Sequence, residues 1–133
     1  MYLLNTRATP SGIRYAKGSV NGVDGVIVLP DDWSASYCAL INTNSGSASF
    51  SGNTISADQW SAMERLGAVF LPAAGGRKGT SVYYEGSRGY YWSSSYNNGD
   101  YAYDVYFLES NMYPQCRDYR YYGRSVRLVR STR

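Results

Sequence analysis

Two short apolar runs mark the first half of the chain, and each ends at a proline. They occupy residues 26–30 (VIVLP) and 68–72 (AVFLP). Runs of this length are typical of buried strands, and proline ends such a strand because it has no amide hydrogen for the ladder. The dipeptides Asn21-Gly22 and Asp24-Gly25 favour the positive φ of a tight turn. We therefore predict a hairpin over residues 15–29 and a second buried strand at 68–71.

One clear helix is predicted between these two runs. Ser56 and Gln59 have the spacing of a capping box, in which each side chain bonds a backbone amide at the other's position, so a helix should follow over about residues 57–66. Gly67 is placed to end it in a left-handed conformation. Apolar side chains recur at the spacing of a core-facing stripe, at Trp60, Met63 and Leu66.

Two segments rich in small and polar residues predict loops. Residues 42–53 are rich in Asn, Ser and Gly, which indicates an exposed loop with Phe50 tucked under it. Residues 73–79 (AAGGRKG) invite comparison with a phosphate-binding loop, but the Gly-Lys-Ser/Thr ending is absent and no strong helix follows. A plain loop is the favoured interpretation.

The second half predicts short strands at residues 90–94, 102–108 and 125–129, with a turn at 97–100 (NNGD). In the middle strand, alternation places one set of side chains in the core and the other on the opposite face: Tyr103, Val105 and Phe107 against Ala102, Asp104 and Tyr106. In the last strand, Val126 and Leu128 should point inward and Arg127 outward. The chain is therefore predicted to be one α+β domain over residues 1–133, with short antiparallel strands, one helix and long loops.

Composition separates the two halves. Twelve of the fifteen tyrosines lie between Tyr83 and Tyr122, interleaved with Asn, Ser, Asp and Gly. Tyrosine supplies a large flat contact area with few rotatable bonds, and the small polar residues supply adaptable hydrogen bonds, which is the composition of binding loops. A recognition surface is the favoured interpretation. A tyrosine-rich antiparallel sheet is the alternative, because aromatic residues also favour strands.

The charge of the chain says little about its binding partner. The formal net charge is +3, and six arginines crowd residues 117–133. Arginine among aromatics can bind nucleic acid, but a pI near 8.9 is modest for that role. We therefore favour the interpretation that these arginines occupy the solvent-exposed face of a strand, and a nucleic-acid partner is disfavoured.

Cys38 and Cys116 could form one long-range disulfide in an oxidising compartment, and two free thiols are the alternative that we favour.

Several classes of function are disfavoured by what the sequence lacks. It contains no histidine, the commonest general base and zinc ligand, so no catalytic residue, cofactor or metal is assigned. Asn97, Asn98 and Asp100 could supply oxygens to a weak calcium site, but a β-turn explains them better. No apolar run approaches the ~20 residues of a membrane helix, so membrane insertion is not expected. Residues 1–7 do not resemble a secretion signal.

The order and spacing of several short segments resemble the FISUMP-type domain. These segments are residues 89–94 (GYYWSS), 101–103 (YAY) and 123–129 (GRSVRLV), with weaker matches at 3–7, 29–30, the Trp60 helix and 70–75. That family is similar to the formylglycine-generating-enzyme branch of the C-type-lectin-like fold, which this resemblance implies for nearly the whole chain. Members usually carry helical residues before the Tyr2 position, which implies a truncated or excised domain.

The resemblance does not carry over the activities of the wider fold. Formylglycine-generating enzymes use two cysteines close together in the active site, and neither Cys38 nor Cys116 lies in such a motif. Sugar-binding lectins hold calcium with Glu-Pro-Asn or Gln-Pro-Asp and Trp-Asn-Asp, and this chain has none of these. Catalysis and calcium-dependent sugar binding are therefore not expected.

The same fold is used by the variable proteins of diversity-generating retroelements, and residues 90–124 look similar to their variable segment. Randomising the adenines of Asn codons yields Asn, Tyr, Ser, Asp, Gly, Arg and Cys among others, and these residue types crowd the segment. The implied fixed positions are Trp92, Ala102, Val105, Phe107, Gly123 and Val126. The implied ligand-binding positions are Tyr90, Ser95, Tyr96, Asn97, Asn98, Asp100, Tyr101, Asp104, Tyr106, Ser110, Asn111, Tyr113, Gln115, Arg117, Asp118, Tyr119 and Tyr121.

We therefore expect a non-enzymatic, receptor- or adhesin-type domain that binds a protein or glycan at a cell surface. The expected location is the cell surface, the secreted fraction or a virion. The alternative is a structural or adhesin domain of a surface or phage assembly without a variable site, and behind it stands a degenerate relative of an enzyme.

Overall fold

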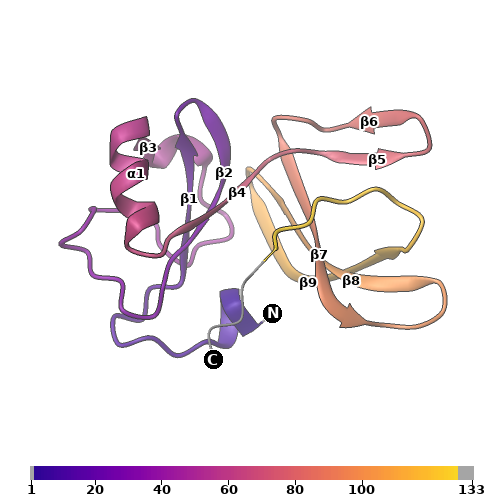
Figure 1. The fold of residues 1–133 in the computed structure, drawn as a ribbon, viewed down its shortest axis with the longest axis horizontal. Coiled ribbons are helices and arrows are strands. Elements are labelled where there is room, and N and C mark those ends of the chain that lie inside the picture. Colours follow the sequence, from indigo (N-terminus) through magenta and orange to yellow (C-terminus); the bar gives the residue numbers. More distant parts are fainter. Residues whose placement is uncertain (1, 129–133) are drawn as a thin grey trace.

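The computed structural model describes residues 2–128, and it confirms a mixed α+β fold made mostly of small sheets. The described part contains one α-helix (Figure 1). The helical elements are the π-helix η1 (Tyr2–Thr6), the 3-10 helix η2 (Phe50–Gly52) and α1 (Ala57–Arg65). The strands are β1 (Tyr15–Val20), β2 (Val23–Val28), β3 (Thr54–Ile55), β4 (Val69–Pro72), β5 (Gly76–Lys78), β6 (Ser81–Tyr83), β7 (Arg88–Tyr96), β8 (Tyr101–Leu108) and β9 (Asn111–Tyr119).

The predicted hairpin and second buried strand are confirmed as parts of one four-stranded sheet. β1 and β2 pair antiparallel, and β4 joins the other edge of β2, in the order β3-β1-β2-β4. Asn21 (φ 48°) and Gly22 (φ 81°) form the turn, as predicted. Gly25 is not a turn residue: it lies within β2, where an added Cβ would approach the Leu71 carbonyl oxygen to 2.4 Å. A glycine is needed at this position because β2 and β4 approach each other too closely for a side chain.

The helix begins as predicted and ends one residue early. Both hydrogen bonds of the capping box at Ser56 and Gln59 are present, and Gly67 has φ 99° just after the last turn. Met63 is buried, and Trp60 packs half-buried with its ring 5.8 Å from that of Phe70. The prediction was wrong for Leu66, which is 42% exposed because the helix ends before turning it toward the sheet.

A second sheet, in the order β7-β8-β9, carries most of the tyrosines. The strands predicted at 90–94 and 102–108 are confirmed and are longer than expected, and the predicted turn at 97–100 joins them. β9 was not predicted, because Pro114 and several polar residues make its sequence untypical of a strand, although its positions alternate between exposed and half-buried. The segment predicted as a loop at 73–79 instead contributes β5 to a short hairpin with β6.

The last predicted strand, at residues 125–129, is wrong in its described part. Gly123 and Ser125 form only isolated bridges, to Arg77 and Tyr91. Val126 and Leu128 are 63% and 87% exposed rather than inward, because after Ser125 no neighbouring strand continues the ladder within the described residues. Residue 129 lies outside the described residues.

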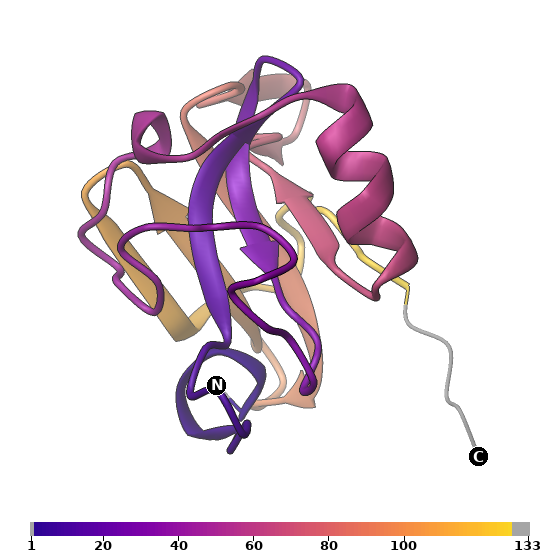
Figure 2. The same ribbon diagram turned by 90° about the vertical axis from the view of Figure 1, so that its left-hand side faces the viewer.

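Side chains on the two faces of the first sheet pack in two separate hydrophobic cores. On one face, Ile27 packs with Trp33 and Met63 beneath α1. On the other, Val26 packs with residues of the second sheet, where Phe107 is fully buried and stacks 6.2 Å from Tyr91. Figure 2 shows β1 and β2 in front of the second sheet, with α1 to one side. The first sheet is therefore the middle layer, and Phe50, as predicted, lies under its loop in the core between the sheets.

Lys17 connects the two sheets through its ammonium group. Its side chain is fully buried, and Nζ donates to the carbonyl oxygens of Gly46, Leu108, Glu109 and Asn111 at 2.5–3.1 Å. Three of these acceptors belong to the β8–β9 connection, which is thereby held against β1. A buried ammonium is tolerated when its donors are satisfied in this way.

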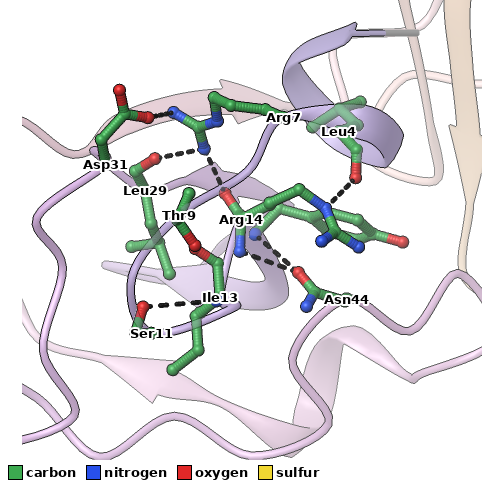
Figure 3. A network of polar contacts seen from close by, with 10 residues as sticks. Leu4, Arg7, Thr9, Ser11, Ile13, Arg14, Leu29, Asp31 and Asn44 are labelled. Atoms are coloured by element: carbon green, nitrogen blue, oxygen red, sulfur yellow. Dashed lines mark hydrogen bonds and ion pairs between the residues drawn. The ribbon is translucent and has the colours of Figure 1, made fainter.

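A polar network fixes the N-terminal segment to the first sheet (Figure 3). Arg7 donates to the carbonyl oxygens of Leu29 (2.6 Å) and Arg14 (3.2 Å) and pairs with Asp31 at 3.1 Å. The Asn44 side-chain oxygen accepts from the Arg14 amide at 2.8 Å. Loop, strand and N-terminal helix are thus tied together, and Leu4 of that helix packs in the core shared with Tyr91 and Phe107 of the second sheet.

Candidate ligand-binding surface

The predicted site residues fall into separate places on the second sheet. Tyr101, Tyr119 and Tyr121 meet at the end that carries the β7–β8 turn. The ring centroids of Tyr101 and Tyr119 are 4.6 Å apart, and Tyr119 stacks on Tyr121 at 5.1 Å. Tyr122 meets both Tyr119 (5.6 Å) and Tyr121 (5.0 Å) edge-on. We call these four residues the tyrosine cluster.

The tyrosine cluster borders a shallow hollow of about 480 Å³. Its lining residues are Gly99, Asp100, Tyr119, Arg120 and Tyr121. Two backbone-directed bonds shape it: the Arg120 amide donates to the Asp100 carbonyl oxygen at 2.9 Å, and the Arg120 guanidinium donates to that of Gly99 at 3.3 Å. The β7–β8 turn itself is held by the side-chain oxygen of Asn98, which accepts a hydrogen bond from the Asp100 amide at 3.0 Å.

Two residues that sequence reasoning left out support the tyrosine cluster. Lys78 of β5 places its ammonium 5.4 Å from the ring centre of Tyr122, and Arg124 places its guanidinium 5.0 Å from the same ring. Hydrogen bonding with Tyr119 raises the pKa of Tyr101. The position of Arg120 between Tyr119 and Tyr121 was a signal that could have marked it as a site residue.

Two further predicted residues lie at the rim of this end. Tyr96 is 68% exposed, and its ring centre lies 6.0 Å from the guanidinium carbon of Arg120. Arg117 is exposed, with its guanidinium carbon 5.5 Å from the ring centre of Tyr101. Asn97 is half-buried in the adjoining turn. The hollow therefore has aromatic walls and cationic edges.

A second group forms a stacked ladder across the three strands. Tyr90, Tyr106 and Tyr113 lie nearly parallel, with centroids 4.7 Å and 5.3 Å apart, and we call them the tyrosine ladder. Tyr90 is only 7% exposed, whereas Tyr113 is 45% exposed. Arg88 covers the neighbouring Tyr84 ring at 3.6 Å. Packing within the sheet therefore uses much of the area of the tyrosine ladder.

Asp104 is buried and Asp118 half-buried beside Arg124, which corrects the prediction for Asp104. Asp104 does lie on the face opposite Phe107, but it is 1% exposed because Arg124 covers it. The Arg124 guanidinium bonds Asp118 and the Tyr83 hydroxyl, lies 3.8 Å from the Asp104 carboxylate, and covers the Tyr90 ring at 4.1 Å. Desolvation, reinforced by Asp118 and opposed by Arg124, raises the pKa of Asp104 to about 6.

The remaining predicted residues lie apart from the tyrosine cluster. Ser95 and Gln115 line a second hollow of about 310 Å³ beside Tyr2. Ser110 and Asn111 lie at the opposite end of the sheet, in the connection held by Lys17. The structure thus brings together only part of the predicted set around the hollow of about 480 Å³.

The chemistry available at this surface is stacking, hydrogen bonding and charge pairing. Among residues 2–128, no group of three or more His, Cys, Asp or Glu side chains is arranged to hold a metal ion. Cys38 and Cys116 are both free thiols in separate parts of the fold. In the part of the chain that the structure describes, no helix has the length and apolarity to cross a membrane.

These observations define a mixed α+β domain with a preformed, tyrosine-lined surface on its second sheet. Residues 38–129 match the profile of a family described as a domain of unknown function (DUF8237), and the chain belongs to that family. No curated protein and no solved structure matches the chain.

Proposed function

We propose that the protein is a non-enzymatic ligand-binding domain whose binding surface is the tyrosine cluster with its adjoining hollow. The observation that carries the proposal is the exposure of ordered aromatic rings: Tyr121 is 69% exposed and Tyr119 is 37% exposed, yet both are held by neighbouring rings. Rigid exposed tyrosines lose little conformational entropy on binding and are frequent hot spots. The partner is a protein or glycan at a cell surface, and the domain acts there, in the secreted fraction or on a virion.

A C-type-lectin-like fold of the kind used by retroelement variable proteins belongs to this proposal. It is supported by the arrangement of the chain, in which residues 90–124 form a sheet and turns beside a separate sheet that packs against the helix. The exposed positions of that segment are suited to replacement, whereas Phe107 is fully buried. Sequencing sibling copies would show clustered changes at Tyr96, Tyr119 and Tyr121 if the segment diversifies, and uniform drift if it does not.

The tyrosine ladder favours the second candidate, a structural or adhesin domain without a variable site. Its rings are stacked on one another, and such pairs contribute to sheet stability without any ligand. In that case the tyrosines serve the sheet, and replacing exposed ones would not change any binding.

Binding to an array of extracellular protein domains and glycans tests the proposal. The variants are a triple substitution, Tyr96→Ser, Tyr119→Asn and Tyr121→Ser, and the control Tyr37→Ser, an exposed tyrosine of the first half. The parent and the control should bind the same spots, and the triple variant should lose ~30-fold or more, since each hot-spot tyrosine is worth ~2 kcal/mol. Equal binding by the parent and the triple variant would contradict the proposal, as would a parent that binds nothing.

A further inference from the structure

We propose that the hollow lined by Asp100, Tyr119, Arg120 and Tyr121 is a binding site for a carboxylate-bearing sugar of a glycan. This inference rests on the proposed function and names its ligand class. Its elements are an aromatic wall, a carboxylate that accepts hydrogen bonds and guanidinium groups at the rim.

The first step is the unbalanced charge around the hollow. Within residues 2–128 the ion pairs are those of Arg7 with Asp31 and of Arg124 with Asp104 and Asp118. Lys78, Arg117 and Arg120, which all contact tyrosine rings at this end, therefore have no carboxylate partner there. Asp100 is the carboxylate that lines the hollow. The local excess of positive charge favours an anionic ligand.

The second step is that the arginines are held in place before a ligand arrives. Arg120 is fixed by its backbone bond to Asp100 and its side-chain bond to Gly99, and Arg117 lies over Tyr101. A guanidinium presents several donors in a planar fork, and only some of those of Arg120 are used. That fork matches the two oxygens of a carboxylate.

The third step is the match between the remaining lining and a pyranose ring. The face of an aromatic ring carries negative charge and attracts the weakly positive C–H face of a sugar, and Tyr121 offers such a face with 69% of the residue exposed. Asp100 can accept bonds from sugar hydroxyls. The volume of about 480 Å³ suits a small ligand of one or two rings.

The carboxylate of Asp100 also separates a sugar from nucleic acid. Asp100 repels any anion, but the ring hydroxyl groups of a glycan can donate hydrogen bonds to it in compensation, whereas the phosphate backbone of DNA carries no hydroxyl group that could do so. The tyrosines could stack on bases, so oligonucleotides remain a necessary comparison.

The test is an array of uronate- and sialate-containing glycans, each beside its methyl-esterified counterpart, with oligothymidylate as a polyanion. The parent domain should bind at least one carboxylated glycan about ten-fold more tightly than its ester, as one charge-assisted bond implies. Oligothymidylate should bind more weakly than that glycan. Absence of binding to every carboxylated glycan, or equal binding of acid and ester, would overturn the inference.

Variants identify the residues responsible. Arg120→Gln should bring the acid-to-ester preference close to one while binding to the ester persists, and Tyr121→Ala should weaken both by about ten-fold or more. Arg65→Gln on α1 is the matched control and should change neither, and thermal melts exclude unfolded variants. An unchanged preference in folded Arg120→Gln would refute the site. If the domain binds extracellular protein domains in a tyrosine-dependent way but binds no carboxylated glycan, the sugar ligand is refuted and the proposed function stands.

Discussion

The two halves of the molecule solve the problem of stability in different ways. Residues 2–72 bury aliphatic side chains and Trp33 on both faces of one sheet, with one helix as cover. Residues 73–128 bury few aliphatic side chains and instead stack tyrosines on one another and on arginines. The first half is built for packing, and the second half holds polar aromatic surface in order without covering it.

Charge follows the same division. The first half has nearly balanced charge, with Arg7, Arg14, Lys17 and Arg65 against Asp24, Asp31, Asp32, Asp58 and Glu64. In the second half, Arg124 occupies Asp104 and Asp118, which leaves cations such as Arg117 and Arg120 at the surface. This difference supports the proposal that the first half supplies the scaffold and the second half the binding surface. The two halves meet in the core around Phe107, and hydrogen bonds from Lys17 and Tyr91 also cross between them.

The largest expected effect is at Phe107. Phe107→Ala should lower the free energy of unfolding by ~3–5 kcal/mol, because the ring is fully buried between Phe50 and Tyr91. Urea denaturation measures it. A loss below ~1 kcal/mol would mean that the core between the sheets contributes little and that the halves are not joined there.

Lys17→Met should have the next largest effect on the same quantity. Methionine fills a similar volume but leaves the carbonyl oxygens of the β8–β9 connection without their buried donor, at a cost of ~1–3 kcal/mol. The matched control is Lys78→Met, because Lys78 is exposed and should change stability by less than ~0.5 kcal/mol. Equal effects of the two substitutions would show that Lys17 does not tie the second sheet to the first.

Asp104 should make stability depend on pH. Its pKa in the folded protein is raised from 3.8 to about 6, so between these values the folded state binds more protons than the unfolded state. The free energy of unfolding should therefore fall by roughly 2 kcal/mol as pH rises from 4 to 6.5. Asp104→Asn should flatten that slope, and Asp100→Asn, at an exposed carboxylate, should not. An unchanged slope in Asp104→Asn would mean that a group other than Asp104 causes the pH dependence of stability.

Local signals predicted the first half well, and long-range contacts decided the rest. The Asn21-Gly22 turn and the Ser56 capping box need only neighbouring residues, and both are confirmed. Arg124 covering Asp104 joins residues from separate elements, so alternation alone wrongly exposed the carboxylate. β9 was missed because Pro114 and polar residues obscure its strand pattern, whereas pairing with β8 and stacking of tyrosine rings stabilise it in the structure.

The candidate surface was predicted in composition and not in arrangement. Clustered tyrosines marked residues 90–124, but the sequence could not say that Tyr101, Tyr119 and Tyr121 meet while Ser110 and Asn111 lie at the other end of the sheet. Sheet register makes that difference, and β9 had not been foreseen.

The thermal stability of two variants measured side by side tests the central claim that recognition surface and scaffold are separable. The triple variant Tyr96→Ser, Tyr119→Asn and Tyr121→Ser removes exposed rings of the second half, and Phe107→Ala removes the buried ring that joins the halves. The triple variant should lose only ~1–2 kcal/mol, mostly ring stacking at Tyr119, whereas Phe107→Ala should lose ~3–5 kcal/mol. A triple variant that unfolds as readily as Phe107→Ala would contradict the account, because the tyrosines would then be part of the core.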